Sequence, residues 1–136
     1  MKITGLDHIT INIKDVEKTN FFYGELLGLK ELPSIDMGDH LLRYFAIPGG
    51  TRLELIQYRY PTRNLEYEAT DKGIARHFAF VVKDVKTLEK RLTEAGYPFC
   101  SPVTSNEKLG FAGGLVKAPN GFELEFLEYP SKTEKE

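Results

Sequence analysis

Hydrophobic and polar positions alternate along two stretches of the chain, residues 8–13 and 77–82. Every second residue in each stretch is apolar, which is typical of a β-strand whose two faces differ in character. An aspartate follows each stretch, Asp15 in the first and Asp84 in the second, and aspartate is a good N-cap of a helix. The pattern therefore predicts a strand leading into a helix at both places.

The segments after the two aspartates carry apolar residues at helical spacing. The first segment runs to Gly28 and the second to Gly96, and glycine is common just beyond a helix end. Pro48-Gly49-Gly50 and Pro119-Asn120-Gly121 predict hairpin turns. The strands expected around these turns are 40–47, 52–60, 110–118 and 122–129. The order of elements is one strand, one helix and about three strands, and it occurs twice.

This order reflects an internal repeat. His8 and His77 lie 69 positions apart, and Glu54 and Glu125 lie 71 apart within similar apolar runs. A fixed spacing of this kind indicates one structural unit used twice. We expect an α+β fold in a single domain of residues 1–130, with two sheets that enclose a cleft. The expected parts are module one at about 1–60, a connection at 61–73, module two at about 74–130 and a flexible tail at 131–136.

Composition narrows the functional classes. A net charge of −2 over 136 residues gives no electrostatic basis for binding nucleic acid or an anionic membrane. Cys100 is the only cysteine, which excludes an intramolecular disulfide and a zinc site built on several cysteines. The sequence shows neither a signal-peptide pattern nor an apolar run of roughly 18 residues. We therefore expect a cytoplasmic protein with a small-molecule substrate.

The repeated residues predict a metal site. A single glutamate on an amphipathic strand usually faces solvent, but here each module has one His and one Glu in corresponding places. Two carboxylates in an apolar cleft would repel each other, and a divalent cation would offset both charges while taking two imidazole nitrogens. The candidate metal ligands are His8, Glu54, His77 and Glu125. Zn or Ni is favoured, with Fe, Co and Mn as further options.

The chain resembles the vicinal oxygen chelate superfamily, which comprises glyoxalase, bleomycin-resistance and extradiol dioxygenase proteins. The resemblance covers residues 3–129. It is carried by Asp7-His8-Ile9-Thr10-Ile11, Phe22-Tyr23, Leu26-Leu27-Gly28-Leu29, Leu53-Glu54-Leu55-Ile56, His77-Phe78-Ala79-Phe80 and Pro119-Asn120-Gly121. It implies paired βαβββ modules that form a half-open barrel around a divalent metal, and a homodimer. The four predicted ligands match the glyoxalase I type, which uses all four positions.

The resemblance implies a metal-dependent lyase or isomerase that moves a proton between adjacent carbons of a chelated substrate. Glu125 or Glu54 would be the catalytic base, and the residues leave that choice open. One alternative is an Fe(II) extradiol-type dioxygenase in which Glu54 is a pocket residue. Another is a non-catalytic protein that binds a drug or metabolite in the same cleft.

Candidate substrate-binding residues are Asn12, Tyr58 and Phe111. Proteins of the glyoxalase I type carry an arginine where Asn12 stands, and neutral asparagine cannot pair bidentately with a carboxylate. This departure weighs against glutathione as a co-substrate, although Arg43 or Arg59 could compensate. Gly110, Gly113 and Gly114 are consistent either with a mobile flap or with a bulged strand.

Overall fold

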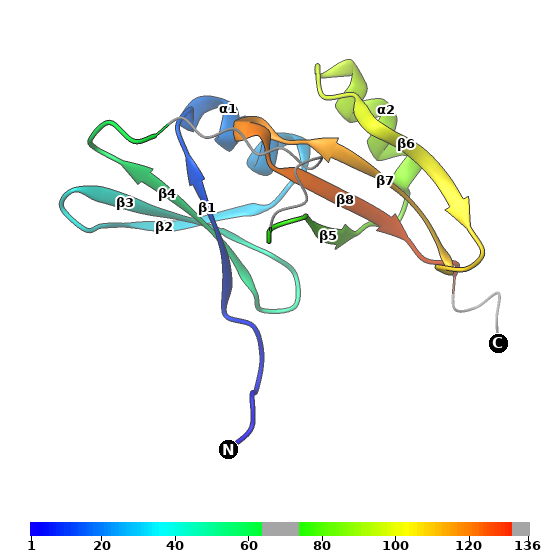
Figure 1. Cartoon of the computed structure of the whole chain (residues 1–136), viewed down its shortest axis with the longest axis horizontal. Coiled ribbons are helices and arrows are strands. Elements are labelled where there is room, and N and C mark those ends of the chain that lie inside the picture. Colours follow the sequence, from blue (N-terminus) through cyan, green and yellow to red (C-terminus); the bar gives the residue numbers. More distant parts are fainter. Residues whose placement is uncertain (64–73, 132–136) are drawn as a thin grey trace. The chain divides into compact units, whose positions relative to one another are not determined.

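Figure 1 shows a computed structural model of the chain, which describes residues 1–63 and 74–131. Two compact units make up the chain, Met1–Leu65 and Glu66–Glu136. Most of the connection expected at 61–73, and all but the first residue of the expected tail, lie outside the described residues. Among the described helices, none is both long and apolar enough to cross a membrane.

The first module contains one strand, a helical segment and three further strands. Its elements are β1 (His8–Ile13), α1 (Val16–Asn20), η1 (Phe21–Leu26), β2 (Lys30–Asp36), β3 (His40–Ala46) and β4 (Arg52–Tyr58). The sheet has the strand order β1-β4-β3-β2. The pairing of β1 with β4 is parallel, and the other pairings are antiparallel.

The second module repeats this arrangement. Its elements are β5 (Phe78–Val81), α2 (Val85–Glu94), β6 (Phe99–Asn106), β7 (Phe111–Lys117), η3 (Pro119–Gly121) and β8 (Glu123–Glu128). The sheet has the equivalent order β5-β8-β7-β6, with β5 and β8 parallel. The predicted α+β class and the two βαβββ modules are therefore confirmed.

Both helical segments begin where the sequence predicted. The Asp15 carboxylate accepts a hydrogen bond from the Lys18 amide, and the Asp84 carboxylate accepts one from the Thr87 amide, each at 3.0 Å. The first helix differs from expectation, because α1 passes into a π-helical turn, η1, instead of continuing as one α-helix. In this turn the Leu27 amide donates to the Phe22 carbonyl at 3.0 Å. The wider turn accompanies the burial of two consecutive aromatic side chains, Phe22 and Tyr23.

The start of β5 also differs. The sequence placed His77 within this strand, whereas pairing begins one residue later, with Phe78 opposite Leu124. His77 therefore lies immediately before the strand, and one-residue differences at an element end are common.

Each sheet packs one face against its own helix. In the first module, Phe45 and Leu53 are fully buried neighbours, and the Phe45 ring lies 6.1 Å from the Tyr23 ring of η1. In the second module, Leu124 and Phe126 of β8 are buried on the face that meets α2. Side chains alternate along a strand, so Glu54 and Glu125 project from the opposite face of their sheets.

Candidate metal centre

His8 and Glu54 form a close pair on the face of the first sheet that does not meet the helix. β1 and β4 are parallel neighbours, with His8 opposite Arg52 and Thr10 opposite Glu54. This register leaves His8 Nε2 at 3.7 Å from Glu54 Oε1. The Glu54 side chain is only 10% exposed and the His8 side chain 39%. A buried carboxylate thus faces an accessible imidazole.

Two hydroxyl groups hold the Glu54 carboxylate. Thr10 Oγ1 donates to Oε1 at 2.8 Å, and the Tyr44 hydroxyl donates to Oε2 at 2.5 Å. Both donors lie directly opposite Glu54 in the sheet, Thr10 in β1 and Tyr44 in β3. Burial by itself would raise the pKa of Glu54, but the hydrogen bonds from Tyr44 and Thr10 outweigh it, and the pKa is lowered. Glu54 is therefore held as a carboxylate.

Asp7 orients the His8 ring. Its carboxylate lies 2.6 Å from His8 Nδ1 and accepts a hydrogen bond from Arg52 at 2.8 Å. These hydrogen bonds, the one with His8 first, lower the pKa of Asp7. A proton on Nδ1 leaves the lone pair of Nε2 free for a ligand. The Arg52 guanidinium also lies over the Tyr44 ring, 4.4 Å from its centroid.

His77 and Glu125 form the corresponding pair in the second module. Their Nε2 and Oε1 atoms lie 3.4 Å apart, and the side chains are 26% and 24% exposed. His77 Nδ1 is buried, and no hydrogen-bond partner for it occurs among the described residues. Within the described part of either module, the possible metal-binding side chains form a pair and not a group of three or more.

Within each pair, the imidazole nitrogen and the carboxylate oxygen are separated by a distance that suits binding to the same metal ion. Two ligands bound to zinc at about 2.1 Å, with a tetrahedral angle between them, lie about 3.4 Å apart. The observed distances of 3.7 Å and 3.4 Å are close to that value. Imidazole nitrogen with carboxylate oxygen is a donor set that first-row divalent metals accept. The imidazole and carboxylate of each pair therefore fit a divalent metal ion.

The predicted substrate-binding residues divide between the modules. Asn12 and Tyr58 lie on the same face of the first sheet as Glu54, since they are two strand positions from Thr10 and four from Glu54. Tyr58 packs against the His40 ring, with centroids 5.9 Å apart. His40 Nδ1 in turn lies 2.6 Å from the Asp39 carboxylate.

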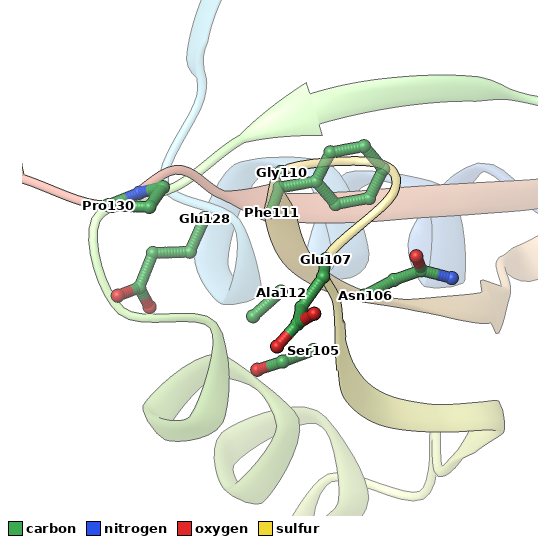
Figure 2. A pocket seen from close by; sticks show the side chains of 8 residues that line it. All are labelled: Ser105, Asn106, Glu107, Gly110, Phe111, Ala112, Glu128 and Pro130. Atoms are coloured by element: carbon green, nitrogen blue, oxygen red, sulfur yellow. The ribbon is translucent and has the colours of Figure 1, made fainter.

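Phe111 lines a pocket of about 330 Å³ at the β6–β7 hairpin. The pocket is formed by Ser105, Asn106, Glu107, Gly110, Phe111, Ala112, Glu128 and Pro130. Figure 2 shows the Phe111 ring pointing away from the carboxylates of Glu107 and Glu128. Glu128 accepts from the amide of Val85, the first residue of α2, so this pocket lies on the helix side of the sheet. His77 and Glu125 are not among its lining residues.

Arg43 and Arg59 were considered as replacements for the arginine that is absent at position 12, and both already have a partner. Arg43 donates to Gln57 at 3.0 Å, on the face of the sheet opposite Glu54. Arg59 pairs with Asp36 at 2.7 Å and lowers the pKa of Asp36 to about 2. Arg52 is paired with Asp7. The side chains described near the first metal pair therefore offer no unpaired guanidinium for a glutathione carboxylate.

Two of the three glycines of the glycine-rich stretch belong to a strand, and Gly110 lies in the turn before it. Gly113 and Gly114 lie in β7, which pairs with β6 across two register shifts. The extra residue of each register shift lies in the partner strand β6, so the pairing shows a strand at Gly113 and Gly114 but places the bulges opposite it.

Sequence reasoning identified both His–Glu pairs but not the residues around the first one. No role in the site was assigned from the sequence to Asp7, Thr10, Tyr44 or Arg52. Comparison of the repeats carries a signal, because Asp7 corresponds to Arg76 and Arg52 to Glu123. The contact of Tyr44 with Glu54 depends on the β3–β4 register, which no sequence motif specifies.

Comparison with known proteins agrees with this architecture. The family model described as Glyoxalase/Bleomycin resistance protein/Dioxygenase superfamily matches residues 5–126. The chain belongs to this superfamily, also known as the vicinal oxygen chelate superfamily.

Solved structures of similar fold include several members of that family. The trypanothione-dependent glyoxalase I of Leishmania major is 26% identical, with a TM-score of 0.73, covering 98% of this chain and 92% of that one. A glyoxalase family protein from Enterococcus faecalis is 23% identical, with a TM-score of 0.75 and coverage of 94% and 100%. The fosfomycin resistance protein FosX of Listeria monocytogenes is 19% identical, with a TM-score of 0.72 and coverage of 99% and 100%.

Proposed function

We propose that this chain is a metal-dependent lyase or isomerase of the glyoxalase I type. In this proposal His8, Glu54, His77 and Glu125 hold one divalent ion, zinc or nickel in the first instance. The substrate is a small molecule with neighbouring oxygens, and the reaction moves a proton between adjacent carbons. We further propose that the protein acts as a homodimer in the cytoplasm.

One observation supports the proposal most strongly. Each module has an imidazole and a carboxylate on the face opposite its helix, at separations of 3.7 Å and 3.4 Å. Family members that use three ligands can replace the first glutamate, whereas here Glu54 is present, buried and hydrogen-bonded. The similarity to a trypanothione-dependent glyoxalase I points in the same direction.

The chain's residues divide the chemistry between them. When bound, the divalent ion polarises a substrate oxygen and so makes the neighbouring C–H bond more acidic. Glu54 is fixed by two hydroxyl donors and serves to hold the ion. Glu125 faces only His77 among the described polar side chains. Its carboxylate is thus free to remove the proton and return it to the adjacent carbon.

The first sheet also indicates the character of the substrate. Asn12 can hydrogen-bond a substrate oxygen but offers no charge. Ile56 lies between Glu54 and Tyr58 on the same face, so the surface beyond the metal pair is apolar and then aromatic. We therefore expect substrates without an anionic thiol tail to be preferred over glutathione adducts.

The direct test has two parts. First, native protein is analysed for metal content. Second, proton transfer is followed by NMR in deuterated buffer. The substrates are a panel of α-hydroxycarbonyl compounds and the methylglyoxal–glutathione adduct. We expect deuterium to enter the carbon next to the carbonyl, with Glu125→Gln lowering the rate by at least 100-fold. Glu128→Gln is the matched control, since this glutamate is in the same strand as Glu125 but points to the helix side of the sheet.

Three results distinguish the alternatives. Oxygen uptake with catechols and bound iron would support the extradiol-type dioxygenase instead. Tight binding of a compound without turnover would support a sequestering protein. Failure of the purified chain to contain or bind any divalent metal would contradict the proposed function.

A further inference from the structure

The first His–Glu pair lies inside a closed set of contacts. Asp7 contacts His8 Nδ1 at 2.6 Å and Arg52 at 2.8 Å. Arg52 lies over the Tyr44 ring at 4.4 Å, and Tyr44 donates to Glu54 at 2.5 Å. Glu54 in turn faces His8 at 3.7 Å. Both candidate ligands of this module are therefore held from behind by side chains that contact one another.

The second module has an ion pair at the same place, but with its signs reversed. Arg76 corresponds to Asp7 in the repeat, and Glu123 corresponds to Arg52. Arg76 and Glu123 lie 2.6 Å apart. The residue preceding His77 is consequently a cation, and His77 Nδ1 is buried without a hydrogen-bond partner among the described residues. Within residues 1–63 and 74–131, no carboxylate contacts Nδ1 of this second imidazole.

The two glutamates also differ in their surroundings, because only the one in the first module has side-chain hydrogen-bond donors opposite it on the neighbouring strands. Glu54 lies between Thr10 and Tyr44 in the first sheet, and both donate to it. Glu125 lies between Ala79 and Leu115 in the second sheet. Neither of these apolar side chains can donate a hydrogen bond. The repeat thus preserves the ligands and changes what supports them.

Support of this kind has known consequences at metal sites. A carboxylate on the distal nitrogen of a ligating histidine fixes the tautomer and the ring orientation, and makes the imidazole a stronger donor. A carboxylate held by hydroxyl groups loses less conformational freedom when it binds. Loss of such an outer partner typically lowers metal affinity by 10- to 100-fold.

We propose that Asp7 and Tyr44 are positioning residues for the metal, and that they make the first module the half of the site that retains the ion. The second module is the half whose ligands exchange during turnover. This inference rests on the proposed function, because it assumes that the four residues share one ion. It adds that the two modules hold the metal with unequal strength, which the repeated ligand pattern alone does not indicate.

The test measures the dissociation constant for Zn²⁺ by competition with a chromophoric chelator, using the full chain. We expect Asp7→Ala and Tyr44→Phe each to weaken Zn²⁺ binding by about 10- to 100-fold. Asp7→Asn keeps an acceptor oxygen and should recover part of the affinity. The matched control is Arg76→Ala, which removes the equivalent ion pair of the second module and should change the constant by less than about threefold.

A second readout separates positioning from folding. The visible absorption of the Co²⁺-loaded protein reports on ligand geometry, so Tyr44→Phe should shift its bands while Arg76→Ala leaves them unchanged. Thermal unfolding of the metal-free variants identifies any that fold poorly. The Asp7 side chain is 73% exposed, so its replacement should change the free energy of unfolding little.

The outcomes are distinguishable from failure of the proposed function. If wild-type protein binds Zn²⁺ but Asp7→Ala and Tyr44→Phe bind it equally well, the inference is wrong and the proposed function stands. Equal losses in Asp7→Ala and Arg76→Ala would also overturn the unequal division. A wild-type chain that binds no metal overturns both.

Discussion

Glu54 illustrates how local contacts decide the state of a buried acid. A carboxylate that loses water is destabilised in its charged form unless hydrogen bonds replace the lost hydration. Tyr44 and Thr10 supply two such bonds, at 2.5 Å and 2.8 Å. The hydrogen bond to the carboxylate raises the pKa of Tyr44 and keeps its proton on the phenol oxygen. Glu54 is therefore charged and held in one orientation before any ligand binds.

This arrangement predicts a stability cost for removing one donor. Tyr44→Phe keeps the aromatic ring but leaves Glu54 Oε2 without its hydroxyl partner. We expect the metal-free chain to lose about 1–3 kcal/mol in free energy of unfolding, as is usual when a buried polar group loses its partner. Urea denaturation measures the loss, with Tyr58→Phe as a control at a half-buried tyrosine. Equal midpoints for wild type and Tyr44→Phe would contradict the prediction.

At this scale the sequence predicted the ligand pairs but not their support. His8, Glu54, His77 and Glu125 recur at fixed spacing, so the repeat alone singles them out. Asp7 and Arg76 occupy equivalent positions and have opposite charges. This difference becomes apparent only when the two repeats are aligned. The role of Tyr44 depends on a strand register, which involves residues distant in sequence.

The structure predicts opposite effects on stability when alanine replaces a glycine in η1 and a glycine in β7. Gly24 lies in η1, where an added Cβ would lie 3.4 Å from the Phe45 ring, close to ordinary contact. Gly114 lies in β7, where a Cβ would lie 2.6 Å from both the Phe99 ring and the Ser101 carbonyl oxygen. One site has room for a methyl group, and the other has backbone in the way.

We therefore expect Gly24→Ala to stabilise the chain by about 0.5–1 kcal/mol, because alanine loses less backbone entropy on folding. Gly114→Ala should destabilise it by about 1–3 kcal/mol through overpacking. Thermal unfolding of both variants against wild type provides the comparison. A stabilised Gly114→Ala variant would show that β6 and β7 do not approach as closely as described.

An acid-sensitive ion pair joins Asp36, at the end of β2, to Arg59, the residue after β4. The Arg59 hydrogen bond lowers the pKa of Asp36 to about 2 from its ordinary value of 3.8. Because the folded-state pKa is the lower one, the pair stabilises the fold above about pH 4 and loses this contribution as the pH falls towards 2. Both side chains are exposed, so the effect is small and decreases with salt.

Asp36→Asn is expected to have a slightly lower urea midpoint than wild type at pH 6. The difference should close as the pH is lowered from about 4 to 2, where wild type also loses the charge. A difference that stays constant across this range would show that the pair does not titrate as described. Glu31→Gln, at an exposed position of β2, is the control for a simple change of net charge.

Much of the element pattern follows from simple periodicities. Alternation predicted β1 and β5, and the aspartate caps predicted where α1 and α2 begin. The π-helical turn was not predicted, because apolar spacing does not distinguish an inserted residue from a continuing helix. The register shifts between β6 and β7 were not predicted either, because the apolar pattern of one strand does not specify which residues of its partner are left unpaired.

For the whole molecule, the repeat predicts the fold class and the number of modules. Both sheets have the same topology, with the first strand of each module parallel to the last. Each module pairs one imidazole with one carboxylate, and that much follows from the repeat and the strand pairing. The sharing of one ion by both pairs is the step that the proposed function adds.

That step predicts linked effects of a change in one module. His77→Ala should lower metal occupancy and thermal stability together, because an ion that binds only the folded chain stabilises it, by about 2.7 kcal/mol at a hundredfold excess over its dissociation constant. Melting temperatures are measured with saturating Zn²⁺ and with a chelator. Wild type should show a large difference and His77→Ala a small one. Equal melting temperatures for wild type in both conditions would contradict the prediction.

The most direct measurement is the stoichiometry of metal binding in wild type and in one variant of each module. The account predicts one tightly bound divalent ion per chain in wild type, detected by elemental analysis after gel filtration. The metal content should fall both in His8→Ala and in His77→Ala. Two ions per chain, or a metal content that either substitution leaves unchanged, would show that the modules do not share a metal.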